Sequence, residues 1–197
     1  MRRWGSFALA YAALGIVATV IAVVWRNGSP LVHPEPWLVL EPRASHTYSL
    51  LLGVSFGALI VVSTRPLVTR FAWARNLYQD LQPIAHSLSS AAIVVLALLS
   101  ALGEELLFRG LMLPWIGIVP QALVFGLVHY LPTKSRWAWA AWATLVGLGF
   151  GAMFQLTGSL AGPLAAHALI NGLNLFYLKR RDPLPQRRLG GLLGQRS

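Results

Sequence analysis

Residues 99–113 read LSALGEELLFRGLML, a largely apolar stretch that contains two adjacent carboxylates, Glu104 and Glu105, and one arginine, Arg109. A charged side chain near the centre of a bilayer costs at least about 2.5 kcal/mol, so such residues are usually retained for a function. If this stretch crosses a membrane, its three charged side chains therefore mark a functional site. The rest of the chain decides whether it does.

The composition is that of a membrane protein. Of the 197 residues, 56% are hydrophobic and only 11% are charged, and the mean hydropathy is +0.60. A soluble domain carries about 25% charged residues. The absence of cysteine excludes disulfides and a thiol nucleophile. We predict an all-α fold, a polytopic membrane helix bundle in which residues 1–197 form a single integral membrane domain.

Apolar stretches of the length that crosses a bilayer, about 20 residues, predict about six transmembrane helices. They are Ser6–Trp25, Tyr48–Ser63, Ser87–Leu113, Trp115–Leu131, Trp137–Thr157 and Ser159–Leu178. The first is longer than the apolar part of a signal peptide and lacks a small-residue cleavage site, so we expect it to be retained.

One further helix is predicted at the membrane surface, in the stretch LVTRFAWARNLYQDLQ at residues 67–82. At helical spacing its larger apolar residues share one face, and most of its polar residues lie elsewhere. The apolar face comprises Leu67, Phe71, Ala74, Tyr78 and Leu81. This pattern is typical of an amphipathic helix lying on the interface.

The basic residues give the predicted orientation. The net charge is +10, but the charges cluster at the ends of the spans, which argues for topology and against a nucleic-acid partner. If the spans alternate, only Arg26 and Arg43 fall on the outer side, and the remaining arginines and lysines, apart from Arg109 within a span, face the cytoplasm. The positive-inside rule then places both termini in the cytoplasm and makes residues 179–197 a basic cytoplasmic tail.

The polar residues predicted at membrane depth come from three spans. Glu105 and Arg109 are four residues apart and share a helical face, whereas Glu104 points about 100° away and has no partner on its own helix. At 1.5 Å per residue, Glu104, His129 and His167 lie at depths of about 14, 21 and 12 Å from the same side. We expect them to meet near the middle of the membrane.

Such a group suits the hydrolysis of an amide. A carboxylate in apolar surroundings becomes a general base for water, His129 can position that water, and His167 and Asn171 can donate to the oxyanion. Ser100 and Ser159 stand in no serine-hydrolase motif. Spacing leaves a catalytic zinc open, because two histidines and a glutamate are a known ligand set. Hydrogen bonds that only join the helices are the structural alternative.

Three motifs resemble those of the CPBP family of intramembrane proteases, which includes type II CAAX prenyl endopeptidases and bacterial relatives termed Abi. They are E-E-x-x-x-R at Glu104, Glu105 and Arg109, F-x-x-x-H at Phe125 and His129, and H-x-x-x-N at His167 and Asn171. The resemblance covers residues 87–178, the motif-bearing core. It implies that Glu104 and His129 activate water and that His167 and Asn171 form the oxyanion hole. Glu105, Arg109 and Phe125 would support the site.

The resemblance also implies a metal-independent enzyme, without a cofactor, in a bacterial inner membrane. Its expected partners are the lipid bilayer and a membrane-protein or peptide substrate. Because the predicted topology places the site closer to the outer face, we expect protein sorting: removal of a C-terminal segment from exported proteins, as by myxosortases. CAAX-type processing of a lipidated protein is the second hypothesis, and a non-catalytic immunity or scaffold protein is the third.

Overall fold

The structure, a computed structural model, describes residues 3–130, 132–133 and 135–180. Its elements are α1 (Arg3–Arg26), α2 (Pro42–Arg70), α3 (Ala72–Ser87), α4 (Ser90–Glu105), the π-helix η1 (Leu106–Met112), α5 (Leu113–Ile116), α6 (Ile118–Val128), α7 (Arg136–Thr157) and α8 (Ala161–Arg180). Within these residues no β-strand forms, and the predicted all-α bundle is confirmed. The predicted tail lies outside the described residues from position 181 onward.

Among the described residues, four stretches are long and apolar enough to cross a membrane: Trp4–Arg26, Pro42–Arg70, Ser90–Ile116 and Arg136–Thr157. They correspond to the first, second, third and fifth predicted spans. The fourth predicted span is interrupted at Gly117, whose φ of +82° ends α5, so that α6 is only 11 residues long. The sixth corresponds to α8, which has 20 residues. The total of six spans stays a prediction.

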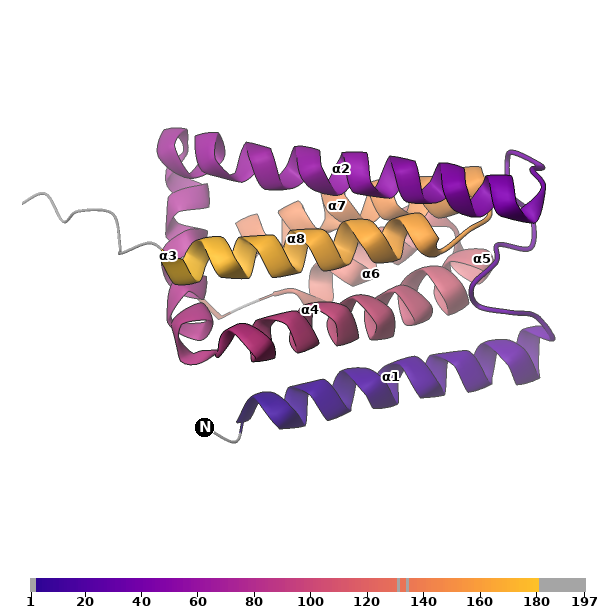
Figure 1. Cartoon of the computed structure of the whole chain (residues 1–197), viewed down its shortest axis with the longest axis horizontal. Helices are drawn as coiled ribbons and strands as arrows, with labels where there is room; N and C mark the ends of the chain where they lie inside the picture. The colour runs from indigo at the N-terminus through magenta and orange to yellow at the C-terminus, as the bar shows by residue number, and fades with distance from the viewer. Residues whose placement is uncertain (1–2, 131, 134, 181–197) are drawn as a thin grey trace, which may run out of the picture.

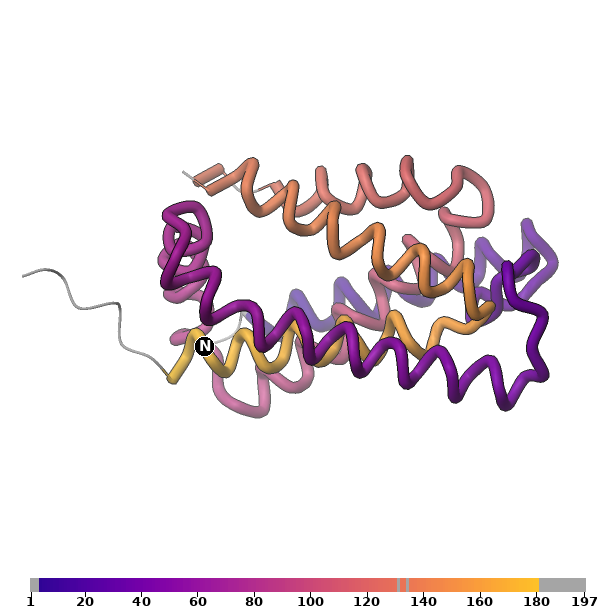
Figure 2. The backbone as a smooth tube through the Cα atoms, turned by 90° about the horizontal axis from the view of Figure 1, so that it is seen from above, coloured from indigo at the N-terminus to yellow at the C-terminus, as the bar shows by residue number. Residues whose placement is uncertain are grey.

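The long helices run side by side, and α3 crosses one end of the bundle (Figure 1). The start of α1 and the end of α8 lie at that same end. Figure 2 shows α6 and α7 together on one side, apart from α2 and α8. The main helix pairs are α2 with α8, α6 with α7, α1 with α4, and α4 with α8. Helix α8 therefore lies between α2 and α4.

Helix α1 buries only a narrow stripe of small residues. Ala18 and Ala22 pack into a core cluster with Leu106 and Leu160, whereas large apolar side chains such as Val24 are 78% exposed. A helix that leaves most of its apolar surface uncovered in water would promote aggregation. This face is therefore the surface that contacts lipid.

Glycines permit the closest helix contacts. A Cβ atom added at Gly53 of α2 would collide with the backbone of Gly162 in α8, and one at Gly103 of α4 would collide with the carbonyl of Tyr11 in α1. Ser49 reinforces the first contact, because its Oγ donates to Ser159 O at 2.8 Å and accepts from Gly162 N at 3.0 Å. Small residues at such crossings are typical of membrane helix packing.

The predicted surface helix is present but begins and ends five residues later than expected, as α3. Phe71 adopts an extended conformation, which separates α3 from α2, so Leu67 belongs to α2 and the prediction of one helix over 67–82 is wrong at its start. The apolar face of α3 does not point only toward lipid, since Ala74 and Tyr78 are buried against Leu178 at the end of α8. Helix α3 is thus docked on the bundle.

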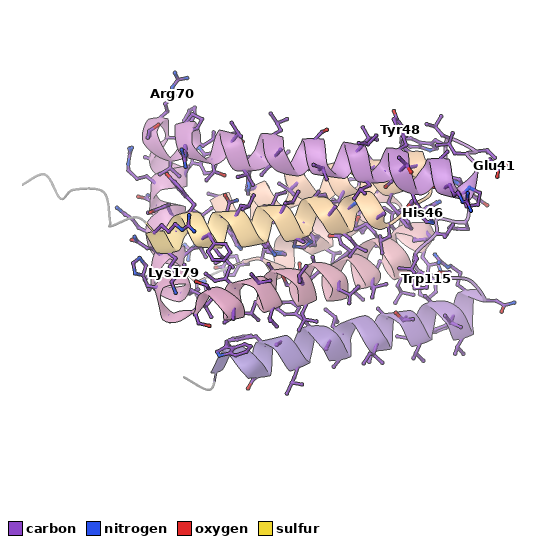
Figure 3. The ribbon with its side chains drawn as sticks, viewed as in Figure 1. Glu41, His46, Tyr48, Arg70, Trp115 and Lys179 are labelled. Atoms are coloured by element: carbon purple, nitrogen blue, oxygen red, sulfur yellow. The ribbon has the colours of Figure 1, made fainter. Side chains whose placement is uncertain are left out.

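The two ends of the bundle differ in charge. Arg70 and Lys179 mark the end crossed by α3, and Glu41, His46 and Trp115 lie at the opposite end (Figure 3). The Lys179 ammonium donates to the carbonyl of Leu88, which joins α8 to the start of α4. The contrast agrees with the charge asymmetry read from the sequence, while the side of the membrane that each end faces stays a prediction.

Candidate active site

A buried ion pair lies where α4 continues into η1. Arg109 Nη1 donates to Glu105 Oε1 at 2.9 Å, and Arg109 Nη2 donates to the carbonyl of Gly147 in α7 at 3.1 Å. Both charged side chains are 0% exposed. The guanidinium carbon also lies 4.3 Å from the ring centre of Phe125 and 5.1 Å from that of Phe150. Arg109 therefore joins three helical segments around one charge.

The local backbone makes room for this arginine. Residues 106–112 widen into a π-helix, a conformation that is often found at functional sites. A Cβ atom at Gly147 would lie 3.2 Å from Arg109 Nη2 and 3.0 Å from Phe125. Gly147 thus leaves space for the arginine and accepts its hydrogen bond.

The same carboxylate orients His167. The Nδ1 atom of His167 lies 2.7 Å from Glu105 Oε1, and because a carboxylate only accepts, Nδ1 carries the hydrogen. The imidazole stacks on Phe150 with the ring centres 5.4 Å apart. Glu105 therefore accepts from both Arg109 and His167, and the Nε2 atom of His167 is left facing Glu104.

His129 is held in the same manner at the end of α6. Its Nδ1 lies 2.7 Å from the carbonyl of Phe125, one of the carbonyls left without a partner where a helix ends. A carbonyl accepts, so Nδ1 again carries the hydrogen and Nε2 is an acceptor. The F-x-x-x-H spacing thus aligns the histidine, while the phenylalanine ring covers Arg109.

Both histidines face the carboxylate of Glu104. Its Oε2 lies 3.7 Å from His129 Nε2 and 3.8 Å from His167 Nε2, and the residue is 7% exposed. Within the described part of the chain this buried oxygen has no hydrogen-bond partner. The three atoms are acceptors, and their separations exceed a direct hydrogen bond. A donor placed between them satisfies this arrangement, and a water molecule donates two hydrogens.

Asn171 lies one helical turn from this group. Its Nδ2 donates to Ser100 Oγ at 3.0 Å, and Ser100 precedes Glu104 by one turn of α4. The polar contacts of α4 with α8 therefore include Glu104 and Glu105 with His167, and Ser100 with Asn171. The structure brings Glu104, His129 and His167 together, while Asn171 keeps one amide hydrogen for another acceptor.

Of two further residues near the site, Tyr11 was missed in the sequence and Ser100 was considered only as a nucleophile. The hydroxyl of Tyr11 in α1 lies close enough to the Glu104 carboxylate to interact with it, next to the contact of α1 with Gly103. Ser100 is buried and supports Asn171. A tyrosine in an apolar helix is too common to attract notice, whereas the position of Ser100 four residues before Glu104 was a usable signal.

A metal centre requires several ligand side chains that converge on one point. Among the residues that the structure describes, no group of three or more histidine and acidic side chains is arranged so that it could hold a metal ion. Within the group at Glu104, both histidines present Nε2 to the same carboxylate oxygen.

The comparisons with known proteins concern this same part of the chain. Residues 86–173 match the family model described as type II CAAX prenyl endopeptidase Rce1-like. Over 124 residues the chain is 30% identical to a protein of Bacillus subtilis (strain 168) described as uncharacterized protein YpbD. That match covers 61% of this chain and 64% of the relative, less than two thirds of its length. Among solved structures none matches the chain.

Proposed function

Because residues 86–173 place the chain in the Rce1-like family of type II CAAX prenyl endopeptidases, we propose that it is an intramembrane endopeptidase that uses Glu104 to activate water. Its substrate would be a membrane-associated protein or peptide. The resemblance seen in the three motifs is confirmed at the level of the family. The residue roles and the substrate are our proposal, and they are supported by the geometry of the side chains.

The observation that carries the proposal is the convergence of three acceptors. Glu104 Oε2 lies 3.7 and 3.8 Å from the two imidazole Nε2 atoms. A water held between them donates one hydrogen to the carboxylate and one to His129, which leaves an oxygen lone pair directed outward. Low dielectric surroundings strengthen these bonds.

The reaction then balances with the groups present. Glu104 removes a proton from the water as the oxygen attacks the carbonyl carbon of the scissile peptide, and a tetrahedral oxyanion forms. Glu104 returns that proton to the amide nitrogen as the carbon–nitrogen bond breaks. The products are a carboxylic acid and an amine, and the enzyme regains its starting state. General base catalysis of this kind contributes about 10²–10⁴-fold in rate.

His167 and Asn171 are proposed to stabilise the oxyanion. Asn171 spends one amide hydrogen on Ser100 and can offer the other. His167 gives its Nδ1 hydrogen to Glu105, so it donates through Nε2 only when it is doubly protonated. Glu105 stabilises that imidazolium as a carboxylate orients a catalytic histidine in other hydrolases. Glu105 would therefore be a positioning residue as well as the partner of Arg109.

Two substrate classes follow from different observations. The charge asymmetry predicts a site nearer the outer face, which favours removal of a C-terminal segment from an exported protein. The family supports the cleavage of a lipidated C-terminal peptide on the cytoplasmic side. Both reactions cut near the carboxyl end of a membrane-attached protein, so one experiment addresses both.

The test is C-terminal peptide mass spectrometry on membrane and surface proteins from host cells carrying the wild type, Glu104→Gln or the exposed control Glu41→Gln. We expect a set of proteins that keep their C-terminal segment only with Glu104→Gln. Exported proteins in that set support sorting, and prenylated ones support CAAX-type processing. Unchanged C-termini with stably inserted Glu104→Gln protein would contradict the proposal and favour a non-catalytic immunity or scaffold role.

A further inference from the structure

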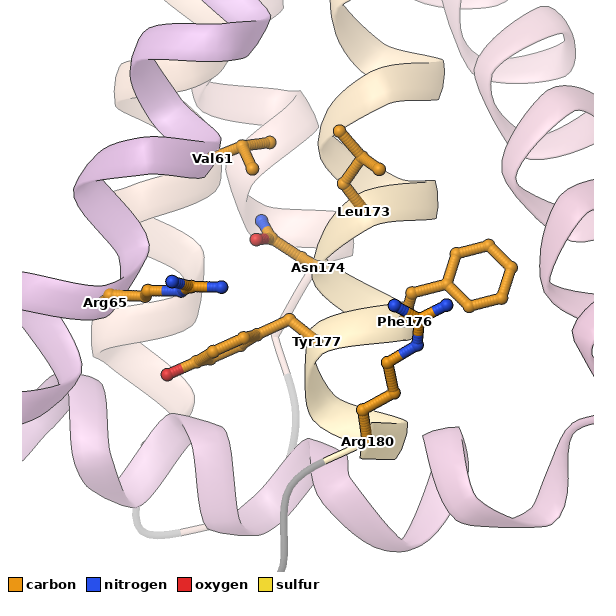
Figure 4. A pocket seen from close by; sticks show the side chains of 7 residues that line it. All are labelled: Val61, Arg65, Leu173, Asn174, Phe176, Tyr177 and Arg180. Atoms are coloured by element: carbon orange, nitrogen blue, oxygen red, sulfur yellow. The ribbon is translucent and has the colours of Figure 1, made fainter.

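A second site lies away from the carboxylates, between α2 and α8. The cavity has a volume of about 270 Å³ and is shown in Figure 4. Its polar lining consists of Arg65 from α2 with Asn174, Tyr177 and Arg180 from α8, and its apolar lining includes Val61 and Phe176. Two guanidinium groups and one amide therefore border a pocket whose remaining walls are hydrocarbon.

The two guanidinium groups have no acidic partner in the described part of the chain, where every ion pair belongs to the group around Glu104 and Glu105. Each arginine lies against an aromatic ring instead. Arg65 Cζ is 5.5 Å from the ring centre of Tyr177, and Arg180 Cζ is 5.8 Å from that of Phe176. Stacking fixes the plane of a guanidinium and leaves its N–H edges available to an anion.

The pocket has an apolar end and a charged end, as the positions of its lining residues along α2 and α8 show. Helices α2 and α8 run in the same direction, and both reach the end of the bundle that α3 crosses (Figure 1). Val61 precedes Arg65 by one turn and Leu173 precedes Tyr177 by one turn, so the apolar walls lie toward the middle of the bundle. The guanidinium groups lie toward its end, near the exposed Arg70 and near Lys179. This order matches a lipid molecule, with its headgroup at the membrane surface and its chains inside.

We propose that this pocket binds the phosphate of an anionic phospholipid, with Arg65 and Arg180 as its ligands and Val61, Leu173 and Phe176 against the acyl chains. Asn174 and Tyr177 have polar atoms in the same pocket and would add hydrogen bonds to the headgroup oxygens. The proposal concerns binding and is independent of the peptidase reaction. Its consequence is that a specific lipid joins α2 to α8, the helix that carries His167 and Asn171.

The test compares the thermal unfolding of the purified full-length protein in nanodiscs of phosphatidylcholine with and without 20 mol% phosphatidylglycerol, about one lipid in five. Native mass spectrometry of the released protein counts the retained phosphatidylglycerol. The variants are Arg65→Gln, Arg180→Gln and Arg65→Lys, with Arg70→Gln as the matched control. Arg70 lies at the same end of α2 and points away from the bundle (Figure 3).

We expect phosphatidylglycerol to raise the melting temperature of the wild type and of Arg70→Gln. Arg65→Gln and Arg180→Gln should each weaken its retention by about tenfold or more, since each removes a charge-assisted hydrogen bond. Arg65→Lys should retain the lipid weakly, because a lysine keeps the charge but lacks the fork geometry. Both glutamine variants should match the wild type in phosphatidylcholine alone, which shows that they fold.

Three results would overturn the proposal. Equal loss in Arg70→Gln would show diffuse attraction of basic residues to the membrane surface. Equal melting in the two nanodisc compositions would show no lipid site. An equal stabilisation by millimolar inorganic phosphate in phosphatidylcholine would show a general anion site that does not require a lipid.

Discussion

The two glutamates at the C-terminal end of α4 each have a buried Oε2 without a hydrogen-bond partner in the described residues, but only Glu105 has an oxygen that accepts from two close donors. Glu105 Oε1 accepts from Arg109 at 2.9 Å and from His167 at 2.7 Å, and the side chain is fully buried. By contrast, Glu104 Oε2 stands at 3.7 and 3.8 Å from two imidazoles. Adjacent residues of one type thus occupy different environments.

This difference indicates that Glu105 has a structural role, whereas Glu104 is available for catalysis. A buried charge with tight partners has had its desolvation offset, and removing one partner leaves an unpaired charge. A carboxylate oxygen that lies beyond hydrogen-bond distance from its neighbours is free to accept from a donor that arrives with the substrate. Variants that separate activity from stability test this contrast.

The largest expected effect is on activity, from Glu104→Gln. The amide cannot remove a proton from water, so peptide cleavage should fall by about 10²–10⁴-fold. The melting temperature should change little, because Glu104 has no tight ion pair to lose. Cleavage of a substrate found by the C-terminal mass spectrometry, measured in reconstituted vesicles beside a melting curve, checks both. Retained activity would remove Glu104 from the mechanism.

Glu105→Gln should show the opposite pattern. It leaves Arg109 buried without a counter-charge, which costs about 3–5 kcal/mol of stability when a buried pair is broken. We expect less folded protein in the membrane and a lower melting temperature, measured by fluorescence-detected size exclusion after heating. The double variant Glu105→Gln with Arg109→Met removes both charges and should recover part of the loss. A stable single variant would contradict the structural role of Glu105.

The Tyr11→Phe variant tests whether α1 contributes to catalysis by Glu104. It removes the hydroxyl that interacts with the carboxylate and leaves the contact of the Tyr11 backbone with Gly103 unchanged. Losing one polar interaction with a charged group should lower the cleavage rate by about tenfold. Tyr48→Phe, at an exposed position of α2, is the matched control. Equal rates for Tyr11→Phe and wild type would confine the site to the motif-bearing helices.

The smallest expected effect is that of Ser100→Ala. It removes the acceptor that holds the Asn171 amide, and a neutral hydrogen bond of this kind is worth about 0.5–1.5 kcal/mol. Cleavage should fall by roughly two- to tenfold, mostly in the maximal rate, since the oxyanion forms only in the transition state. A larger drop than that of Asn171→Ala would assign Ser100 a role of its own.

Much of this arrangement could be predicted from the sequence, because its causes are local. The apolar stretches can be read directly from the sequence. The four-residue spacing of Glu105 and Arg109 and the broadly similar depths of Glu104, His129 and His167 follow from helix geometry. The bond from His167 to Glu105 could not be predicted, since it depends on the relative rotation of α4 and α8. The same holds for the contact of Tyr11 with Glu104.

Other errors have backbone causes. The break at Phe71 separates two helices within a continuous periodic pattern, and no turn residue marks it. Gly117 adopts a positive φ in a stretch whose hydropathy favours one long helix. The π-helix after Glu105 has no compositional signature, so the space it provides for Arg109 is visible only in three dimensions.

The shortness of α6 has a consequence for the surrounding lipid. Its 11 residues extend about 16 Å, roughly half the thickness of a bilayer's hydrocarbon core. Where a helix ends so early, the membrane thins locally and polar headgroups are drawn inward. His129 stands at that end. The local indentation of the bilayer would then shorten the route by which bulk water reaches the Glu104 carboxylate and replaces each molecule consumed by hydrolysis.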